Sequence, residues 1–291
     1  MRIIDYLTDN PAYFIPVITI LGAMVGSFLN VVIHRMPIMM ERQWRQQCAE
    51  LENPDTAEQP QEIFNLAKPD SHCPHCGHDI RAWENIPILS YLFLRGRCSG
   101  CGARISLRYP IIEAVTALLS AFAAWRFGVS WETAGALLLT WSLIPLTMID
   151  IDHHLLPDSI TLPFLWLGLG LNLFGIYTDL NSAVIGAIAG YLSLWIVYWS
   201  FKLLTGKEGM GYGDFKLLAM LGSWMGWQQL PTVILLSSVV GAVIGIGMIA
   251  LRGRDHSIPI PFGPYLAIAG LIAFYWGGDL TNAYLRFSGI N

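Results

Sequence analysis

From residue 110 almost to its end, this chain is a succession of apolar stretches, and no other feature restricts its fold as strongly. A bilayer is crossed by about 20 apolar residues in helical form. Hydropathy predicts seven spans here, of which the fifth, 215–227, is short; it is the sixth of the chain when an earlier span is counted. An earlier span, Tyr13 to Ile33, is followed by His34, Arg35 and Pro37. We therefore expect an all-α polytopic membrane protein with about eight transmembrane helices. The seven later spans cover residues 110–128, 132–149, 159–177, 183–204, 215–227, 231–251 and 259–277.

The composition agrees with an integral membrane protein whose main surroundings are the lipid bilayer. Hydrophobic residues make up 54% of the chain and charged residues only 13%, against about 25% charged in soluble domains. The net charge of −4 and the lack of a long basic run exclude nucleic-acid binding. No small-residue cleavage site follows the first apolar stretch, and Asp5 and Asp9 precede it, so we expect that stretch to be retained.

Residues 36–109 differ from the rest, because they are charged, contain proline and include no apolar run long enough to span a membrane. We expect three parts: a first transmembrane helix (1–35), an inserted extramembrane domain (36–109) and a seven-helix membrane core (110–291). The first half of the insert, Glu41 to Gln61, is polar and is expected to be partly helical.

Two C-x-x-C pairs organise the second half of the insert. They are Cys73-Pro-His-Cys76 and Cys98-Ser-Gly-Cys101, with 21 residues between the pairs. Gly77 and Gly102 follow the pairs directly, where a tight knuckle needs a positive φ angle. The spacing is close to that of zinc ribbons and predicts a structural Zn²⁺ held by four thiolates. The alternative is a pair of disulfides or plain buried thiols, and Cys48 lies outside the pattern.

The distribution of lysine and arginine predicts the orientation. With eight spans, fourteen basic residues fall on one side of the membrane and three on the other. Basic residues favour the cytosolic side. We therefore expect a cytosolic zinc-ribbon-like domain, with both termini outside, and a reducing compartment disfavours the disulfide alternative.

Two aspartates lie at membrane edges and are candidates for function. Asp150 ends the third predicted span and Asp214, after a glycine-rich run, begins the sixth, so both fall at the cytosolic face. A carboxylate beside hydrocarbon is a functional hypothesis by default. Asp152 is expected to point away from Asp150, and Asp158 stands where the N-cap of the fourth span is expected.

Two carboxylates within hydrogen-bonding reach share one proton, which is the arrangement that aspartic proteases use. Two alternatives remain. The run Asp150, Asp152, His153, His154 and Asp158 has the residue types of a metal-dependent hydrolase. A proton-coupled transporter would use the aspartates as a relay.

Several motifs together resemble the type IV prepilin peptidase family. They are Gly26-Ser-Phe-Leu-Asn-Val-Val-Ile-His-Arg35, the paired C-x-x-C motifs, Ile-Asp-Ile-Asp-His-His-Leu-Leu-Pro-Asp158, Gly211-Tyr-Gly-Asp214 and Pro259-Ile-Pro-Phe-Gly-Pro-Tyr265.

The resemblance implies a G-x-G-D membrane aspartic protease with the catalytic pair Asp150 and Asp214, located in the bacterial inner membrane with its site at the cytosolic face. Its substrates would be type IV prepilins and type II secretion pseudopilins, which lose a short basic leader. The new N-terminal residue would then be methylated with S-adenosylmethionine. The sequence contains no G-x-G-x-x-G signature, so residues that bind the methyl donor are not identified. Glu113 is expected to be an acidic residue in the first turn of the second span, and the alternative is a position close to the methyl-transfer site.

Overall fold

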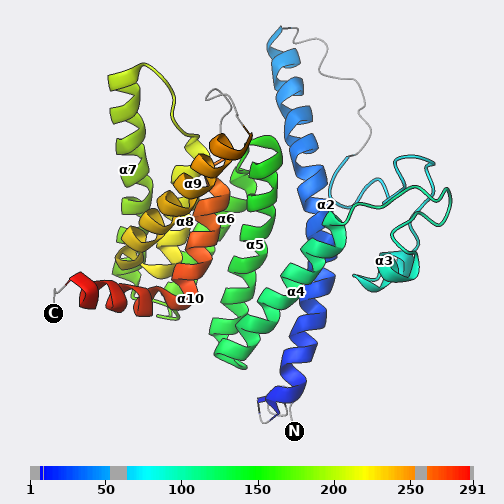
Figure 1. The fold of residues 1–291 in the computed structure, drawn as a ribbon, viewed down its shortest axis with the longest axis horizontal. Helices are drawn as coiled ribbons and strands as arrows, with labels where there is room; N and C mark the ends of the chain where they lie inside the picture. Colours follow the sequence, from blue (N-terminus) through cyan, green and yellow to red (C-terminus); the bar gives the residue numbers. More distant parts are fainter. Residues whose placement is uncertain (1–6, 9, 53–63, 253–260, 289–291) are drawn as a thin grey trace. The chain divides into compact units, whose positions relative to one another are not determined.

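The computed structural model describes residues 7–8, 10–52, 64–252 and 261–288. Within these ranges the regular elements are helices and no strand occurs, apart from two isolated β-bridges (Figure 1). Eight helices have fourteen residues or more, and each overlaps one predicted span, which confirms the all-α prediction. They are α2 (Pro11–Glu52), α4 (Arg108–Phe127), α5 (Trp131–His153), α6 (Asp158–Asn172), α7 (Leu180–Thr205), α8 (Tyr212–Met225), α9 (Leu230–Arg252) and α10 (Gly263–Ser288).

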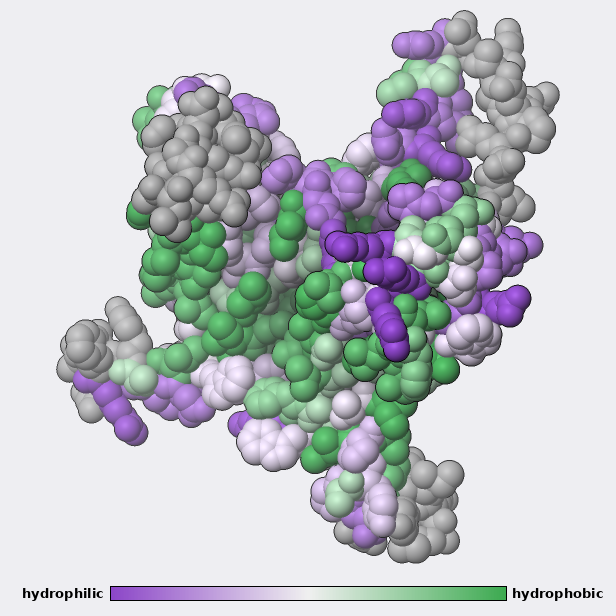
Figure 2. Space-filling view, turned by 45° about the vertical axis from the view of Figure 1, so that its right-hand side comes forward, coloured by the Kyte–Doolittle hydropathy of each residue, from purple (hydrophilic) through white to green (hydrophobic). Residues whose placement is uncertain are grey.

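The chain is an integral membrane protein by the length and hydropathy of its helices. In the described residues, α2, α4, α5, α7 and the segment Trp227–Gly247 are long and apolar enough to cross a membrane. Large apolar side chains stay exposed on them, and Figure 2 shows these as broad green areas. On helices long enough to cross a membrane, a surface of this kind is expected to face hydrocarbon.

Helix α6 ends at Asn172, five residues before the end of the predicted fourth span. Its Asn172 carboxamide explains the early end. The side-chain oxygen accepts hydrogen bonds from the backbone N–H groups of Tyr177 and Thr178, and the nitrogen donates to the carbonyls of Ser223 and Trp224 on α8. The chain is bent back around this buried amide instead of continuing as a helix.

Helix α2 does not end near Pro37, as the sequence suggested, but continues to Glu52. Proline removes one backbone donor, whereas the residues beyond it form helix readily. Two polar pairs four residues apart support this extension, since Arg45 lies 2.6 Å from Glu41 and Gln46 lies 2.9 Å from Glu50. The expected partial helix of the polar half is thus a continuation of α2. Residues 53–61 of that half lie outside the described ranges.

Contacts divide the chain into two compact units, Met1–Pro145 and Leu146–Asn291. The three-part organisation into 1–35, 36–109 and 110–291 stays a prediction. In the first unit α2 packs on α4 through glycine. A Cβ atom at Gly22 would stand 2.5 Å from Ser120 Oγ, and one at Gly26 would stand 2.8 Å from the Cα of Glu113. Small residues of this kind let membrane helices approach closely.

Helix α8 is the centre of the second unit and contacts α6, α7, α9 and α10. It is buried from Asp214 to Met225 except at Lys216. Gly222 meets Gly186 of α7 at backbone contact, and the Trp224 indole donates to the carbonyl of Phe164 on α6 over 2.8 Å. Protein rather than lipid surrounds α8, which explains why fourteen residues suffice for it.

Candidate active site and metal centre

Asp150 lies in the last turn of α5 and is only 6% exposed. Its Oδ2 atom is buried and has no hydrogen-bond partner. The C-terminal end of a helix carries partial negative charge, so α5 does not stabilise an ionised carboxylate there. Asp152, two residues on, is exposed, as the helical periodicity predicts.

Asp214 is the third residue of α8 and is also 6% exposed. Gly211 is the N-cap, and its carbonyl accepts the Asp214 backbone N–H over 3.3 Å. A carboxylate in the first turn lies at the positive end of the helix dipole, where negative charge is stabilised. The two aspartates are therefore equally buried, but Asp150 lies at the C-terminal end of its helix and Asp214 at the N-terminal end of its own.

The two aspartates converge within the second unit, around Leu156. A Cβ atom at Gly213 would stand 2.7 Å from Leu156 Cβ, and one at Gly263 would stand 3.2 Å from Leu156 Cδ1 and 2.6 Å from Asp150 Oδ2. Asp214 follows Gly213 directly in the chain, so it belongs to the same cluster of segments. The segments 150–156, 211–214 and 261–263, remote in sequence, thus form one site.

Gly263 lies at the candidate site and was missed by reasoning from residue types, because glycine has no functional side chain. It is the first residue of α10, is buried, and faces Asp150. The signal available in the sequence was the Gly-Pro pair at the start of the last span, in a run that carried the family resemblance but no assigned role. The first two residues of that run, Pro259 and Ile260, lie outside the described residues.

The glycine-rich segment before Asp214 is tied to α7. Lys202 Nζ lies 2.8 Å from Glu208 Oε1 and donates to the hydroxyl of the buried Tyr198 over 3.2 Å. The Lys202 ammonium lowers the pKa of Glu208 below its usual range, so this partner stays ionised. Gly206 ends α7 with φ = 72°, a left-handed conformation suited to glycine.

Asp158 does not cap α6, contrary to the sequence interpretation. Pro157 is the N-cap residue, and both carboxylate oxygens of Asp158 lie 2.7 Å from Lys216 Nζ on α8. Asp158 therefore forms a salt bridge with α8, which is remote in sequence, and does not cap its own helix. It joins the starts of α6 and α8 next to Asp214.

The run from Asp150 to Asp158 does not gather into a metal cluster. His153 and His154 are exposed, whereas Asp150 is buried and Asp158 is paired with Lys216. Among the described residues, the four cysteines form the only group of three or more His, Cys, Asp or Glu side chains able to hold a metal ion.

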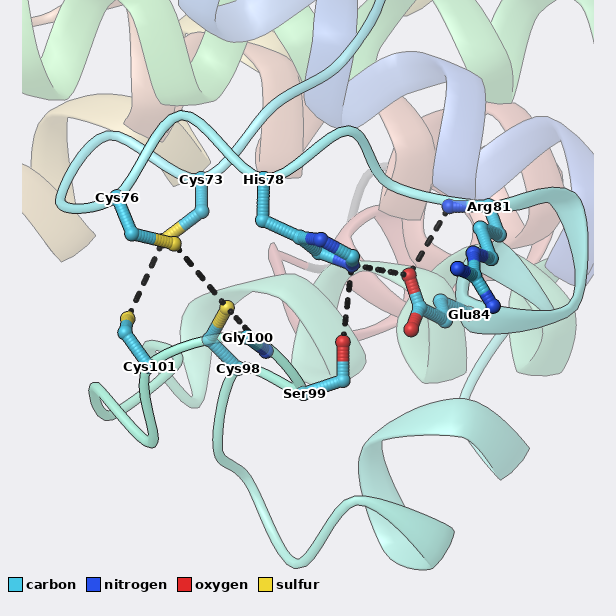
Figure 3. A network of polar contacts seen from close by, with 9 residues as sticks. All are labelled: Cys73, Cys76, His78, Arg81, Glu84, Cys98, Ser99, Gly100 and Cys101. Atoms are coloured by element: carbon cyan, nitrogen blue, oxygen red, sulfur yellow. Dashed lines mark hydrogen bonds and ion pairs between the residues drawn. The ribbon is translucent and has the colours of Figure 1, made fainter.

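The four cysteine sulfurs lie within 4.8 Å of one another. Cys73 Sγ is 3.9 Å from Cys101 Sγ, and Cys76 Sγ is 4.0 Å from Cys98 Sγ (Figure 3). A tetrahedral zinc ion with Zn–S bonds of about 2.3 Å separates its sulfurs by about 3.8 Å, so the donor set fits zinc. All four thiols are free, so the disulfide alternative is wrong for this structure.

A polar network supports the cysteine cluster from the side (Figure 3). His78 Nε2 lies 3.2 Å from Glu84 Oε2 and 3.0 Å from Ser99 Oγ, and the Arg81 backbone N–H donates to Glu84 over 3.0 Å. Hydrogen bonds from Ser99 and Arg81 lower the pKa of Glu84.

Glu113 does not serve as a first-turn acid, because α4 begins at Arg108, two residues earlier than expected. Its carboxylate is buried and accepts the backbone N–H of Ile88 over 2.7 Å. Asn30 donates to the Tyr109 carbonyl over 3.2 Å, and Ser27 Oγ lies 3.3 Å from Asn85 Oδ1. The polar face of α2 thus binds the inserted domain and the start of α4.

Comparisons with known proteins all indicate one family of peptidases, and the similar full-length proteins cover almost the whole chain. Residues 20–127 match the bacterial peptidase A24 N-terminal domain, and residues 137–246 match the type IV leader peptidase family. Similar curated proteins are each called prepilin leader peptidase/N-methyltransferase. They come from Stutzerimonas stutzeri (58% identical, 99% of each chain), Pseudomonas aeruginosa (56%, 99% of each) and Aeromonas hydrophila (59%, 94% of this chain and 95% of that one). No solved structure matches.

Proposed function

Because the chain belongs to the type IV leader peptidase family, we propose that it is an aspartic endopeptidase and N-methyltransferase acting on prepilins. It removes the short basic leader of type IV prepilins and type II secretion pseudopilins and then methylates the new N-terminal residue with S-adenosylmethionine. The observation that carries the peptidase assignment is that two buried aspartates, Asp150 and Asp214, lie on remote segments that pack around Leu156.

The chemistry follows from the proximity of the two carboxylates. Two such groups in one buried site cannot both ionise cheaply, so the pair holds one proton and titrates as a unit. The ionised member takes a proton from water as the water oxygen attacks the scissile carbonyl carbon, and the protonated member donates to the carbonyl oxygen. The C–N bond then breaks, and the leaving nitrogen receives a proton, so the net reaction adds one water.

The N-terminal ends of two helices stabilise the single negative charge that the aspartate pair carries during the reaction. Asp214 is in the first turn of α8, and Asp150 Oδ2 faces the N-terminus of α10 at Gly263. Each helix N-terminus contributes roughly half a positive charge. The unfavourable position of Asp150 at the end of α5 is offset in this way by a helix from another part of the chain.

Cys73, Cys76, Cys98 and Cys101 would hold the zinc ion. Four thiolates close a tetrahedral shell, so zinc here supplies folding stability to the inserted domain rather than an activated water. The domain organisation that goes with this function is a first transmembrane helix (1–35), a zinc domain (36–109) and a membrane catalytic core (110–291). S-adenosylmethionine supplies the methyl group, and we assign no residue to its binding.

The asymmetry of lysine and arginine supports an inner-membrane protein with the zinc domain and the dyad at the cytosolic face. A leader that remains in the cytosol would end at that face. Asp150, late in α5, and Asp214, early in α8, occupy the helix ends that this orientation places there.

Mass spectrometry of a prepilin incubated with purified enzyme, with and without S-adenosylmethionine, tests both activities. Asp150→Asn or Asp214→Asn should eliminate the shortened product, because neither variant can share a proton between two carboxylates. Asp152→Asn is the matched control on the exposed side of the same helix turn and should cleave normally. Near-normal cleavage by either dyad variant would make the assignment wrong.

Two further results separate the alternatives. A metal-dependent hydrolase built on the 150–158 run would lose activity when His153 and His154 are both replaced by Ala, whereas the dyad should remain largely active. A transporter would produce no shortened prepilin at all.

A further inference from the structure

Large apolar side chains are exposed on a short segment of the inserted domain. The segment comprises a 3-10 turn η2 (Ala82–Asn85) and the helix α3 (Leu89–Phe93). A patch of this kind on a small domain marks a contact surface. Its members and their exposed fractions are Trp83 (53%), Ile86 (45%), Leu89 (51%), Leu92 (64%) and Phe93 (82%).

The contacts of this segment give its depth along α2. Near the start of the described insert, Asn65, Leu66 and Pro69 accept hydrogen bonds from the Arg35 guanidinium through their carbonyls. The η2 turn instead meets α2 at Ser27, through Asn85. Arg35 lies eight positions after Ser27 in the same helix, a distance of about 12 Å at 1.5 Å per residue.

The start of α3 lies equally deep. Ile88, its N-cap, donates its backbone N–H to Glu113, and Glu113 packs against Gly26. Figure 1 agrees, because α3 is drawn level with the middle of α2 and far below its C-terminal end. The segment therefore runs alongside the membrane-spanning parts of α2 and α4 and does not lie beyond their polar ends.

The apolar surface of the segment continues that of the two spanning helices. Phe28 on α2 and Ile111 on α4 are 52% and 56% exposed, within two residues of Ser27 and Glu113 respectively. In a membrane-spanning helix, exposed side chains of this type face lipid. The exposed side chains of α3 occur at the same level, so the same hydrocarbon is available to them.

The backbone is suited to a place beside lipid. Ile88 has φ = 61°, and its N–H would be unsatisfied without a nearby acceptor. Glu113 supplies that acceptor from α4 over 2.7 Å. Non-helical backbone persists at membrane depth only where protein satisfies it, and here a buried carboxylate does so. This explains a polar residue in α4 that the cleavage mechanism does not use.

Basic residues flank the apolar segment. Five arginines and one glutamate occur between residues 80 and 108, and the glutamate, Glu84, already pairs with His78. Arginines beside an apolar surface are attracted to anionic lipid headgroups. Four of these arginines are exposed and available to headgroups: Arg81, Arg95, Arg97 and Arg104.

We propose that residues 82–94 form a membrane-inserted element whose apolar side chains contact the acyl chains of the lipids and whose flanking arginines contact anionic headgroups. The inserted domain is then a peripheral part of the membrane surface, held at a fixed depth by α2 and α4. This inference depends on the membrane-spanning character of the helices and not on peptidase activity.

Photocrosslinking in the full-length protein tests it. Phe93 is replaced by p-benzoylphenylalanine, and the protein is reconstituted in vesicles of phosphatidylethanolamine and phosphatidylglycerol without substrate. A matched probe replaces His75, which is exposed on the cysteine knuckle of the same domain. We expect lipid adducts at position 93 at a yield roughly ten times that at position 75, as for a side chain in the acyl region.

Equal yields at the two positions would overturn the proposal. A second arm adds a prepilin. If prepilin adducts replace lipid adducts at position 93, the surface is a substrate-binding face and the lipid assignment is wrong. Vesicles of phosphatidylcholine alone should give a lower lipid yield at position 93, and an unchanged yield would overturn the role of the arginines.

Discussion

At the scale of single residues, the candidate site contains a glycine, Gly263, in close contact with one of its two carboxylates. Gly263 does not have a positive φ angle, so glycine is not required there by backbone conformation. It is required by contact, since a Cβ atom would stand 2.6 Å from Asp150 Oδ2. Any side chain at this position must displace the carboxylate or the start of α10.

Gly263→Ala should lower kcat for prepilin cleavage on the order of 100-fold, since a misplacement of about 1 Å in a catalytic group has that effect. KM should change little, because the change displaces Asp150 and not the substrate. Gly278→Ala is the control on the same helix, where a Cβ atom meets nothing within 4 Å.

The two outcomes separate the site assignment from the proposed role of this glycine. Full activity of Gly263→Ala beside an inactive Asp150→Asn would mean that the contact with Gly263 is unimportant. An equal loss in Gly278→Ala would point to general destabilisation of α10.

A second residue-scale prediction concerns Asp179, the N-cap of α7, whose carboxylate accepts the Ser182 backbone N–H over 2.9 Å. This bond lowers the pKa of Asp179 below its model-peptide value of about 3.9. The stabilisation is therefore fully present above that value and is lost as the pH falls through the folded-state pKa.

Asp179→Ala should lower the Tm of the detergent-solubilised protein at pH 7, and the difference from wild type should shrink as the pH falls below about 4. Asp179→Asn keeps an oxygen acceptor and should retain most of the Tm at pH 7. A Tm difference for the Ala variant that is constant down to pH 2 would show that the carboxylate charge plays no part.

At the scale of elements, the inserted domain owes its shape to two knuckles with the same bonding pattern. In each, the backbone N–H of the first cysteine donates to a carbonyl five residues on, from Cys73 to His78 and from Cys98 to Ala103. A glycine at positive φ follows the second cysteine, at Gly77 and Gly102. Few apolar residues hold the knuckles together, so we expect a bound metal ion to stabilise their fold.

Cys98→Ser should reduce the zinc content from about one ion per chain to nearly none, because a hydroxyl is a poor substitute for a thiolate. Inductively coupled plasma mass spectrometry measures this directly. Cys48→Ser is the control, since Cys48 is exposed and outside the cluster. Freshly prepared, reduced wild-type protein without zinc would contradict the four-thiolate site.

At the scale of the whole molecule, topology follows from the eight long helices and the distribution of charge. The chain offers a native probe of this topology, because Cys48 is an exposed thiol near the end of α2. The four clustered thiols are expected to be protected by their metal.

A membrane-impermeant maleimide should therefore leave Cys48 unmodified in intact spheroplasts and modify it in inverted inner-membrane vesicles. Trp131→Cys, introduced at the first residue of α5, which is 76% exposed, should show the opposite pattern. Modification of Cys48 in intact spheroplasts would reverse the predicted orientation.

The sequence by itself determined the eight long helices of the described residues, the four thiols of the metal centre and the two aspartates that we propose as catalytic. These features are local in the chain: hydropathy sets the spans, and cysteine spacing sets the knuckles. Local reasoning failed where a remote partner intervened. Asp158 forms a salt bridge with Lys216 instead of capping α6. Glu113 accepts the backbone N–H of Ile88 instead of serving as a first-turn acid of α4.

Only the tertiary structure decided what surrounds each of these groups. The buried, unpartnered oxygen of Asp150, the α10 N-terminus at Gly263 and the depth of α3 beside α2 all depend on helices that are remote in sequence. Packing brings these segments together through backbone contacts at small residues, and a glycine in the sequence does not indicate which chain will approach it.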